Sequence, residues 1–176
     1  MSDATIAVID GGRLLRFGLA DLMRYHGPGF PGGVAHAFTV MRRVWPLLDP
    51  SRAPARREIR LETAFRGPGA RDAIELVTRA VTEDRYVVRP DLERPELGHV
   101  RARYVFRWSY RNRTVTLQIR DGFVTDEFIT LSRAPGRSAA QEAHLAVLKQ
   151  EMADRLLAVP PDEVYDVDEQ VVTSGR

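Results

Sequence analysis

The sequence predicts an α+β fold in which helices pack on a small mixed, mostly antiparallel sheet. Apolar residues return every three or four positions, as on the buried face of a helix, over residues 32–48, 70–82 and 138–157. Apolar and polar residues alternate, as in half-buried strands, over residues 58–65, 100–110 and 114–120. Because most of the strands follow one another between helical segments, we expect the helices to lie on one side of the sheet.

The chain begins with a predicted hairpin and a short helix. Residues 5–9 are apolar or β-branched, residues 13–17 combine three apolar residues with two arginines, and Asp10-Gly11-Gly12 between them is typical of a tight turn. Residues 18–25 continue with a short helical pattern, which brings the chain to its first loop rich in glycine and proline.

The helix expected over residues 32–48 carries a stripe of large apolar side chains at steps of three and four residues: Val34, Phe38, Met41, Trp45 and Leu48. His36 falls on a different face, so we expect it at the surface or in an interface. The later helix over 138–157 has a similar stripe, made of Leu145, Leu148, Met152 and Leu156. Both stripes predict helices that face one core.

Between these helices, two alternating segments predict an antiparallel hairpin. One face of the first segment carries Tyr104, Phe106, Trp108 and Tyr110, and the other carries Arg101, Arg103, Val105 and Arg107. A surface that stacks nucleic-acid bases needs aromatic and basic side chains on the same accessible face. We therefore expect a buried aromatic face and solvated arginines.

Composition limits the class of protein. The formal net charge is +2 and lysine occurs once, at Lys149, so the strong basic excess of a nucleic-acid-binding protein is lacking. There is no cysteine, which excludes disulfides and thiolate metal sites. Neither a membrane-spanning run nor a signal peptide is expected, and the composition fits a cytoplasmic protein. We expect one domain over residues 1–167 and a disordered tail over 168–176.

Two loops rich in glycine and proline are the most informative segments. Residues 25–33 read Tyr-His-Gly-Pro-Gly-Phe-Pro-Gly-Gly, and residues 67–69 read Gly-Pro-Gly, each before a predicted helix. Such loops present backbone N–H groups at a helix start. Neither has the spacing of a phosphate-binding P-loop or of a dinucleotide fingerprint.

These loops resemble segments of the formylmethanofuran dehydrogenase E-subunit family. The matching segments are His26-Gly27-Pro28-Gly29-Phe30-Pro31-Gly32, the stretch from Gly67 to Ile74, and the apolar, proline-containing stretch from Leu157 to Val164. The resemblance covers roughly residues 17–167 and implies an α+β domain, here 1–167, that pairs as a homodimer.

The resemblance also implies a metal site, often zinc, held by histidine and cysteine in these loops. Here Pro28 stands in place of the family's second histidine, Phe30 in place of its cysteine, and Gly69 or Ala70 in place of the cysteine of the second loop. Only His26 is left as a ligand type, whereas zinc takes three or four ligands. We therefore predict no metal and no other cofactor; the alternative is zinc held by His26 together with carboxylates or a partner chain.

We predict that both loops form one pocket for a small molecule, with His26 at its centre. His26 and Asp72 are the candidate catalytic residues, because histidine titrates near neutral pH and a carboxylate can orient it. Asp72 has a second interpretation as a first-turn carboxylate that stabilises its helix. The candidate ligand-binding residues are Tyr25, Phe30, Gly32, Arg71 and Glu62. The alternative function is a non-catalytic dimeric scaffold with a relic metal site.

Overall fold

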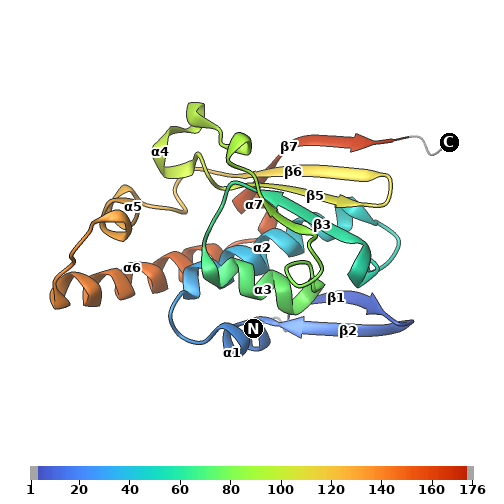
Figure 1. Cartoon of the computed structure of the whole chain (residues 1–176), viewed down its shortest axis with the longest axis horizontal. Helices are drawn as coiled ribbons and strands as arrows, with labels where there is room; N and C mark the ends of the chain where they lie inside the picture. Colours follow the sequence, from blue (N-terminus) through green and yellow to red (C-terminus); the bar gives the residue numbers. More distant parts are fainter. Residues whose placement is uncertain (1–3, 174–176) are drawn as a thin grey trace.

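A computed structural model describes residues 4–173, and it forms three layers (Figure 1). A five-stranded sheet makes the first layer and the helices α2, α3 and α6 make the second. The hairpin of β1 (Thr5–Asp10) and β2 (Arg13–Gly18) is a separate sheet on the far side of the helices. Ile6 and Val8 of β1 are buried in the same core as the helices. The predicted α+β fold is therefore confirmed, with the hairpin as an additional layer.

The five-stranded sheet is mixed and mostly antiparallel, as predicted. Its strand order is β4-β3-β5-β6-β7, and only the β3–β4 pair is parallel. The strands are β3 (Ile59–Thr63), β4 (Tyr86–Val88), β5 (Val105–Tyr110), β6 (Arg113–Ile119) and β7 (Tyr165–Val172). The predicted aromatic face is buried, because Phe106, Trp108 and Tyr110 of β5 and the adjacent Tyr104 all lie in the core.

The helices match the periodic segments closely. They are α1 (Leu19–His26), α2 (Pro31–Leu48), α3 (Pro68–Thr78), α4 (Gly98–Arg101), α5 (Asp126–Arg133), α6 (Ala139–Leu157) and α7 (Pro161–Val164). Short 3₁₀ turns occupy Arg56–Glu58, Pro90–Leu92 and Pro95–Leu97. The predicted stripes of α2 and α6 are buried in one core. The helix α2 contacts α1, α3, α6 and the sheet, which makes it the centre of the fold.

Three predicted boundaries differ from the structure. The helix expected over residues 70–82 ends at Thr78, and Arg79 after it has a left-handed backbone with φ 59°. Residues 98–101 are helical, so the strand expected from residue 100 begins at Val105 instead. Residues 168–172, expected in a disordered tail, continue β7, and residues 169–172 pair with β6; residues 174–176 of that tail lie outside the described part. The polar residues of this segment alternate only weakly and give little local signal of a strand, but backbone hydrogen bonds to β6 fix it.

In residues 4–173, no helix is both long and apolar enough to cross a membrane.

Candidate functional site

The two loops rich in glycine and proline lie side by side and open the neighbouring helices α2 and α3. A Cβ atom on Gly69 would lie 2.6 Å from the Phe30 carbonyl oxygen, and one on Gly33 would lie 3.1 Å from the Ala70 nitrogen. Side chains at either position would therefore push the two helix starts apart. The glycines let the first turns of α2 and α3 approach backbone to backbone.

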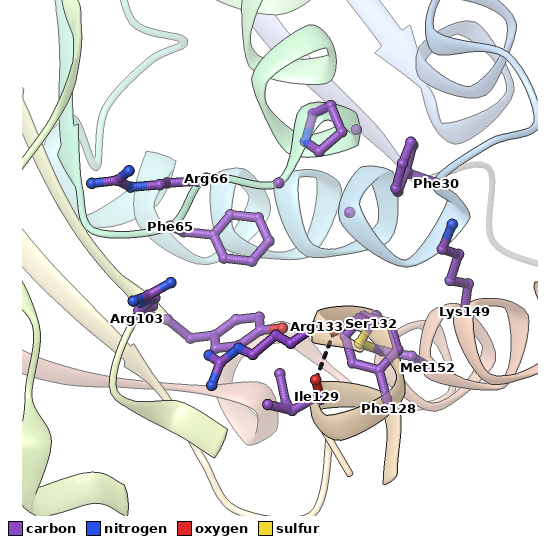
Figure 2. A pocket seen from close by; sticks show the side chains of 15 residues that line it. Phe30, Phe65, Arg66, Arg103, Phe128, Ile129, Ser132, Arg133, Lys149 and Met152 are labelled. Atoms are coloured by element: carbon purple, nitrogen blue, oxygen red, sulfur yellow. Dashed lines mark hydrogen bonds between the residues drawn. The ribbon is translucent and has the colours of Figure 1, made fainter. Parts of the chain in front are cut away.

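A cavity of about 200 Å³ lies against these two helix starts (Figure 2). The loops contribute Phe30, Gly33, Gly67, Pro68 and Gly69 to its wall. Phe65, next to the second loop, adds to the apolar wall, and the rest of it comes from distant parts of the chain: Tyr104, Phe128, Ile129 and Met152. The cavity is thus formed where the loops meet α5 and α6, and no single segment of the sequence contains it.

The helix starts at this cavity offer backbone donors. The helix α2 has Phe30 at its N-cap and α3 has Gly67, and proline occupies the first turn of each. Within the described residues, neither N-cap side chain accepts a hydrogen bond and neither first turn contains an acidic residue. The free N–H groups of a helix start and the helix dipole favour negative charge.

Next to the cavity, His26 and Asp72 form a hydrogen-bonded pair. His26 ends α1, Asp72 lies on α3, and His26 Nδ1 is 2.8 Å from Asp72 Oδ2. The His26 side chain is 8% exposed, and Asp72 is 36% exposed. Within residues 4–173, the buried Nε2 atom of His26 has no hydrogen-bond partner. An ionised carboxylate only accepts, so Nδ1 donates to it and, in the neutral ring, Nε2 carries the lone pair.

Phe30 is the residue that the cavity and the His26 pair share. Its ring lines the cavity, and the ring centroids of Phe30 and His26 are 5.7 Å apart. The Lys149 ammonium lies 3.9 Å from the Phe30 ring centroid and donates to the Gly29 carbonyl at 3.1 Å. Partial burial lowers the pKa of Lys149. Figure 2 shows the Phe30 ring and the Lys149 amine next to each other at one side of the cavity.

The structure places the predicted site residues at several locations. Phe30 lines the cavity, and Gly32 packs against Met152, which also lines it. His26 and Asp72 pair with each other beside Phe30 and do not line the cavity themselves. Tyr25 is half-exposed in a separate hollow next to Arg24.

The other two predicted binding residues lie outside the cavity wall. Arg71 is exposed on α3, outside the cavity wall. Glu62 is on the face of β3 opposite its buried residues, where its carboxylate is 3.2 Å from Arg89 and 3.9 Å from Arg107. The Glu62 carboxylate is therefore engaged in ion pairs on the sheet, and its side chain does not reach the loops.

His36 lies in the core, so the prediction of a surface or interface position is wrong. Its side chain is fully buried, Nδ1 is 2.6 Å from the Tyr165 hydroxyl, and burial lowers the pKa of His36 to about 3. Its ring lies 4.9 Å from Tyr104 and 5.8 Å from Phe65, two residues of the cavity wall. The helix α2 is buried on nearly every side, so residues outside its apolar stripe, including His36, also face the core.

The donor set at the loops does not fit zinc. His26 meets one carboxylate there, whereas zinc sites in proteins have three or four ligands. In the described part of the chain, no three histidine, aspartate or glutamate residues are grouped closely enough to hold a metal ion.

Sequence reasoning missed the cationic residues of the cavity wall: Arg66, Arg103, Arg133 and Lys149. Two of them had a local signal, since Arg66 directly precedes the second loop and Arg103 lies just before the aromatic strand. Arg133 and Lys149 had none, because α5 and α6 reach the loops only through the tertiary fold.

Comparison of the sequence with protein-family models and with curated proteins finds no match. The resemblance to the formylmethanofuran dehydrogenase E-subunit family therefore stays a prediction.

Proposed function

We propose that this protein binds a small molecule in the cavity between the starts of α2 and α3 and the helices α5 and α6. The observation that carries the proposal is a cavity of about 200 Å³ whose wall includes both loops rich in glycine and proline. Ligand sites are typically concave and apolar with a few convergent polar groups, which is the composition of this wall. The resemblance of the loops to those of the formylmethanofuran dehydrogenase E-subunit family supports the same location.

We further propose that His26 and Asp72 carry out acid/base chemistry on the bound molecule. Asp72 accepts from Nδ1 and leaves Nε2 as the basic atom, an arrangement suited to proton transfer. Nε2 is buried, and Phe30 lies beside both His26 and the cavity, so we propose that its ring turns aside to let Nε2 meet a ligand. This residue is 40% exposed, which leaves its ring room to turn.

Ligand-linked stabilisation tests the binding function. Wild type would be screened against a set of small metabolites by thermal unfolding, since a ligand at a hundred times its Kd stabilises by about 2.7 kcal/mol. The variant Ser132→Trp fills the cavity, and Thr130→Trp places the same side chain on the exposed face of α5 as a control. We expect stabilisation of wild type and Thr130→Trp only. Stabilisation of all three proteins, or of none, contradicts the proposal.

The acid/base role has its own test. Once a compound that binds and reacts is found, His26→Gln should keep the affinity and lose turnover, because Nε2 supplies the proton transfer. Turnover equal to wild type in His26→Gln removes His26 from the mechanism and leaves the binding function in place.

The edge strand β7 favours the alternative, a homodimeric scaffold. It lies at one end of the sheet and carries the exposed valines Val167, Val171 and Val172. An unpaired strand edge can pair with another chain, which we propose here to be a second copy. The molar mass measured by light scattering tests this: a dimer that Val171→Lys converts to a monomer supports it, and a monomeric wild type contradicts it.

A further inference from the structure

The charge of the cavity wall is one-sided. Arg66, Arg103, Arg133 and Lys149 line it, and among residues 4–173 no aspartate or glutamate does. Arg66 lies in the β3–α3 loop and Arg103 lies two residues before β5. Arg133 ends α5, and Lys149 is in the middle of α6. Four cations from four distant segments therefore meet at one cavity, and like charges brought close together favour the addition of an anion.

Two of these arginines have no anion of their own. Arg103 is paired with Glu93, Nε to Oε1, at 2.8 Å. In the part of the chain that the structure describes, Arg66 and Arg133 take part in neither an ion pair nor a side-chain hydrogen bond, and both are exposed at the mouth. A guanidinium has five N–H donors in a planar fork that matches a carboxylate or a phosphate.

Lys149 also keeps donors for a ligand. Its ammonium has three N–H donors, and within residues 4–173 it spends one on the Gly29 carbonyl, while the Phe30 ring lies beside it. In Figure 2 the guanidinium groups of Arg66, Arg103 and Arg133 lie on one side of the cavity and the Lys149 ammonium on the other. The uncapped first turns of α2 and α3 add positive potential from the backbone.

The rest of the wall is mostly apolar. Phe65, Tyr104, Phe128, Ile129 and Met152 line it, and the Ser132 hydroxyl is already donated to the Ile129 carbonyl at 2.9 Å. A free inorganic anion would leave these side chains without a partner. An apolar group attached to the anion would cover them and be stabilised by the removal of apolar surface from water.

The volume limits the size of the ligand. At about 30 Å³ per water molecule, a cavity of about 200 Å³ has room for roughly six or seven waters. It is smaller than the sites of about 300–1,000 Å³ that hold drug-sized molecules. A dinucleotide or a peptide therefore does not fit inside.

We propose that the ligand of this cavity is a small amphipathic anion, with one carboxylate or phosphate group on an apolar body of roughly ten non-hydrogen atoms. This inference rests on the proposed function, because it names the chemical class that the same cavity accepts. Arg66 and Arg133 hold the anionic group, and the aromatic wall with Met152 holds the apolar body.

Calorimetric titration at low ionic strength tests the inference with four compounds. Phenyl phosphate and benzoate carry both features, benzyl alcohol lacks the charge, and inorganic phosphate lacks the apolar body. We expect phenyl phosphate or benzoate to bind at least tenfold more tightly than either control compound. The better anion identifies which of the two anionic groups the arginines prefer.

Variants at exposed arginines provide a second test of the inference. We expect Arg66→Gln/Arg133→Gln to weaken binding of the better anion at least tenfold. The control Arg13→Gln/Arg52→Gln removes the same charge from exposed positions outside the cavity wall and should leave the affinity within twofold. Circular dichroism of each variant confirms that it is folded.

The outcomes separate this inference from the proposed function. Benzyl alcohol that binds as tightly as the anions, with loss of binding in Ser132→Trp, overturns the anion and keeps the cavity as a ligand site. Equal weakening of anion binding in the two double variants also overturns the inference. The overall positive potential of the protein would then account for the affinity. Failure of both anions to bind at millimolar concentration overturns it, while the metabolite screen decides the proposed function separately.

Discussion

His26 Nδ1 lies 2.8 Å from Asp72 Oδ2, although the two residues are 46 positions apart in the sequence. The contact joins the end of α1 to α3 and fixes the first loop relative to the second. It also leaves the opposite ring atom, Nε2, buried without a hydrogen-bond partner within the described residues. The pair therefore has both a structural and a chemical consequence, which can be measured apart.

The structural consequence predicts a coupling energy between these two residues. In a double-mutant cycle of His26→Ala, Asp72→Ala and the double variant, we expect a coupling of about 0.5–1.5 kcal/mol, the range of a partly exposed hydrogen bond. Urea unfolding followed by circular dichroism measures it. Strictly additive effects of the two substitutions would show that the pair does not stabilise the fold.

The close approach of the helix starts predicts a large difference between two glycines of the same site. Gly69→Ala should destabilise the protein by about 1–3 kcal/mol, because its Cβ would overlap the Phe30 carbonyl oxygen. Gly29→Ala is the matched control, since a Cβ there meets nothing within 4 Å. We expect a change within about 0.5 kcal/mol for this control.

Denaturant midpoints of the two glycine variants compare them directly. Equal effects of Gly69→Ala and Gly29→Ala would mean that the helix starts are not packed backbone to backbone. A helix interior favours alanine over glycine, so destabilisation at Gly69 would run against intrinsic propensity and report the contact itself.

The buried His36 predicts a pH-dependent loss of stability. Burial lowers the pKa of His36 to about 3, from 6.5, so the unfolded chain takes up a proton there below pH 6.5 while the folded protein stays neutral. Stability from this residue is complete above pH 6.5 and falls by about 1.4 kcal/mol per pH unit as the pH drops towards about 3.

Comparison with His36→Gln isolates this effect from the titration of carboxylates. Between pH 6.5 and about pH 4.5, wild type should lose about 2 kcal/mol more unfolding free energy than the variant. Glutamine retains a group that can hydrogen-bond Tyr165 but does not titrate. Parallel stability curves over this range would show that His36 is solvated in the folded protein.

The sequence predicts the fold better than the site because the two depend on different distances along the chain. Alternation in β5 and the stripes of α2 and α6 are local, and the structure confirms them. Gly33 and Gly69 also have a local signal, since each lies in a loop that opens a helix. Such patterns identify which residues face inward and where the loops lie.

Other features depend on partners that no local pattern names. His36 is buried by Tyr165, which lies 129 residues away, and β7 is ordered through its pairing with β6. Arg133 and Lys149 reach the cavity only because α5 and α6 fold back onto the starts of α2 and α3. Prediction of these positions needs the tertiary fold, since each residue alone has the pattern of a surface residue.

Methyl NMR of methionine tests most directly whether the cavity is a ligand site. Met152 lines the cavity, Met41 is buried in the core, and Met23 packs against the core from α1. With ¹³C-methyl-labelled protein and Met152→Leu for assignment, saturating phenyl phosphate should move the Met152 signal and leave Met41 and Met23 in place. Binding of phenyl phosphate with an unmoved Met152 signal would place the ligand elsewhere and contradict the account.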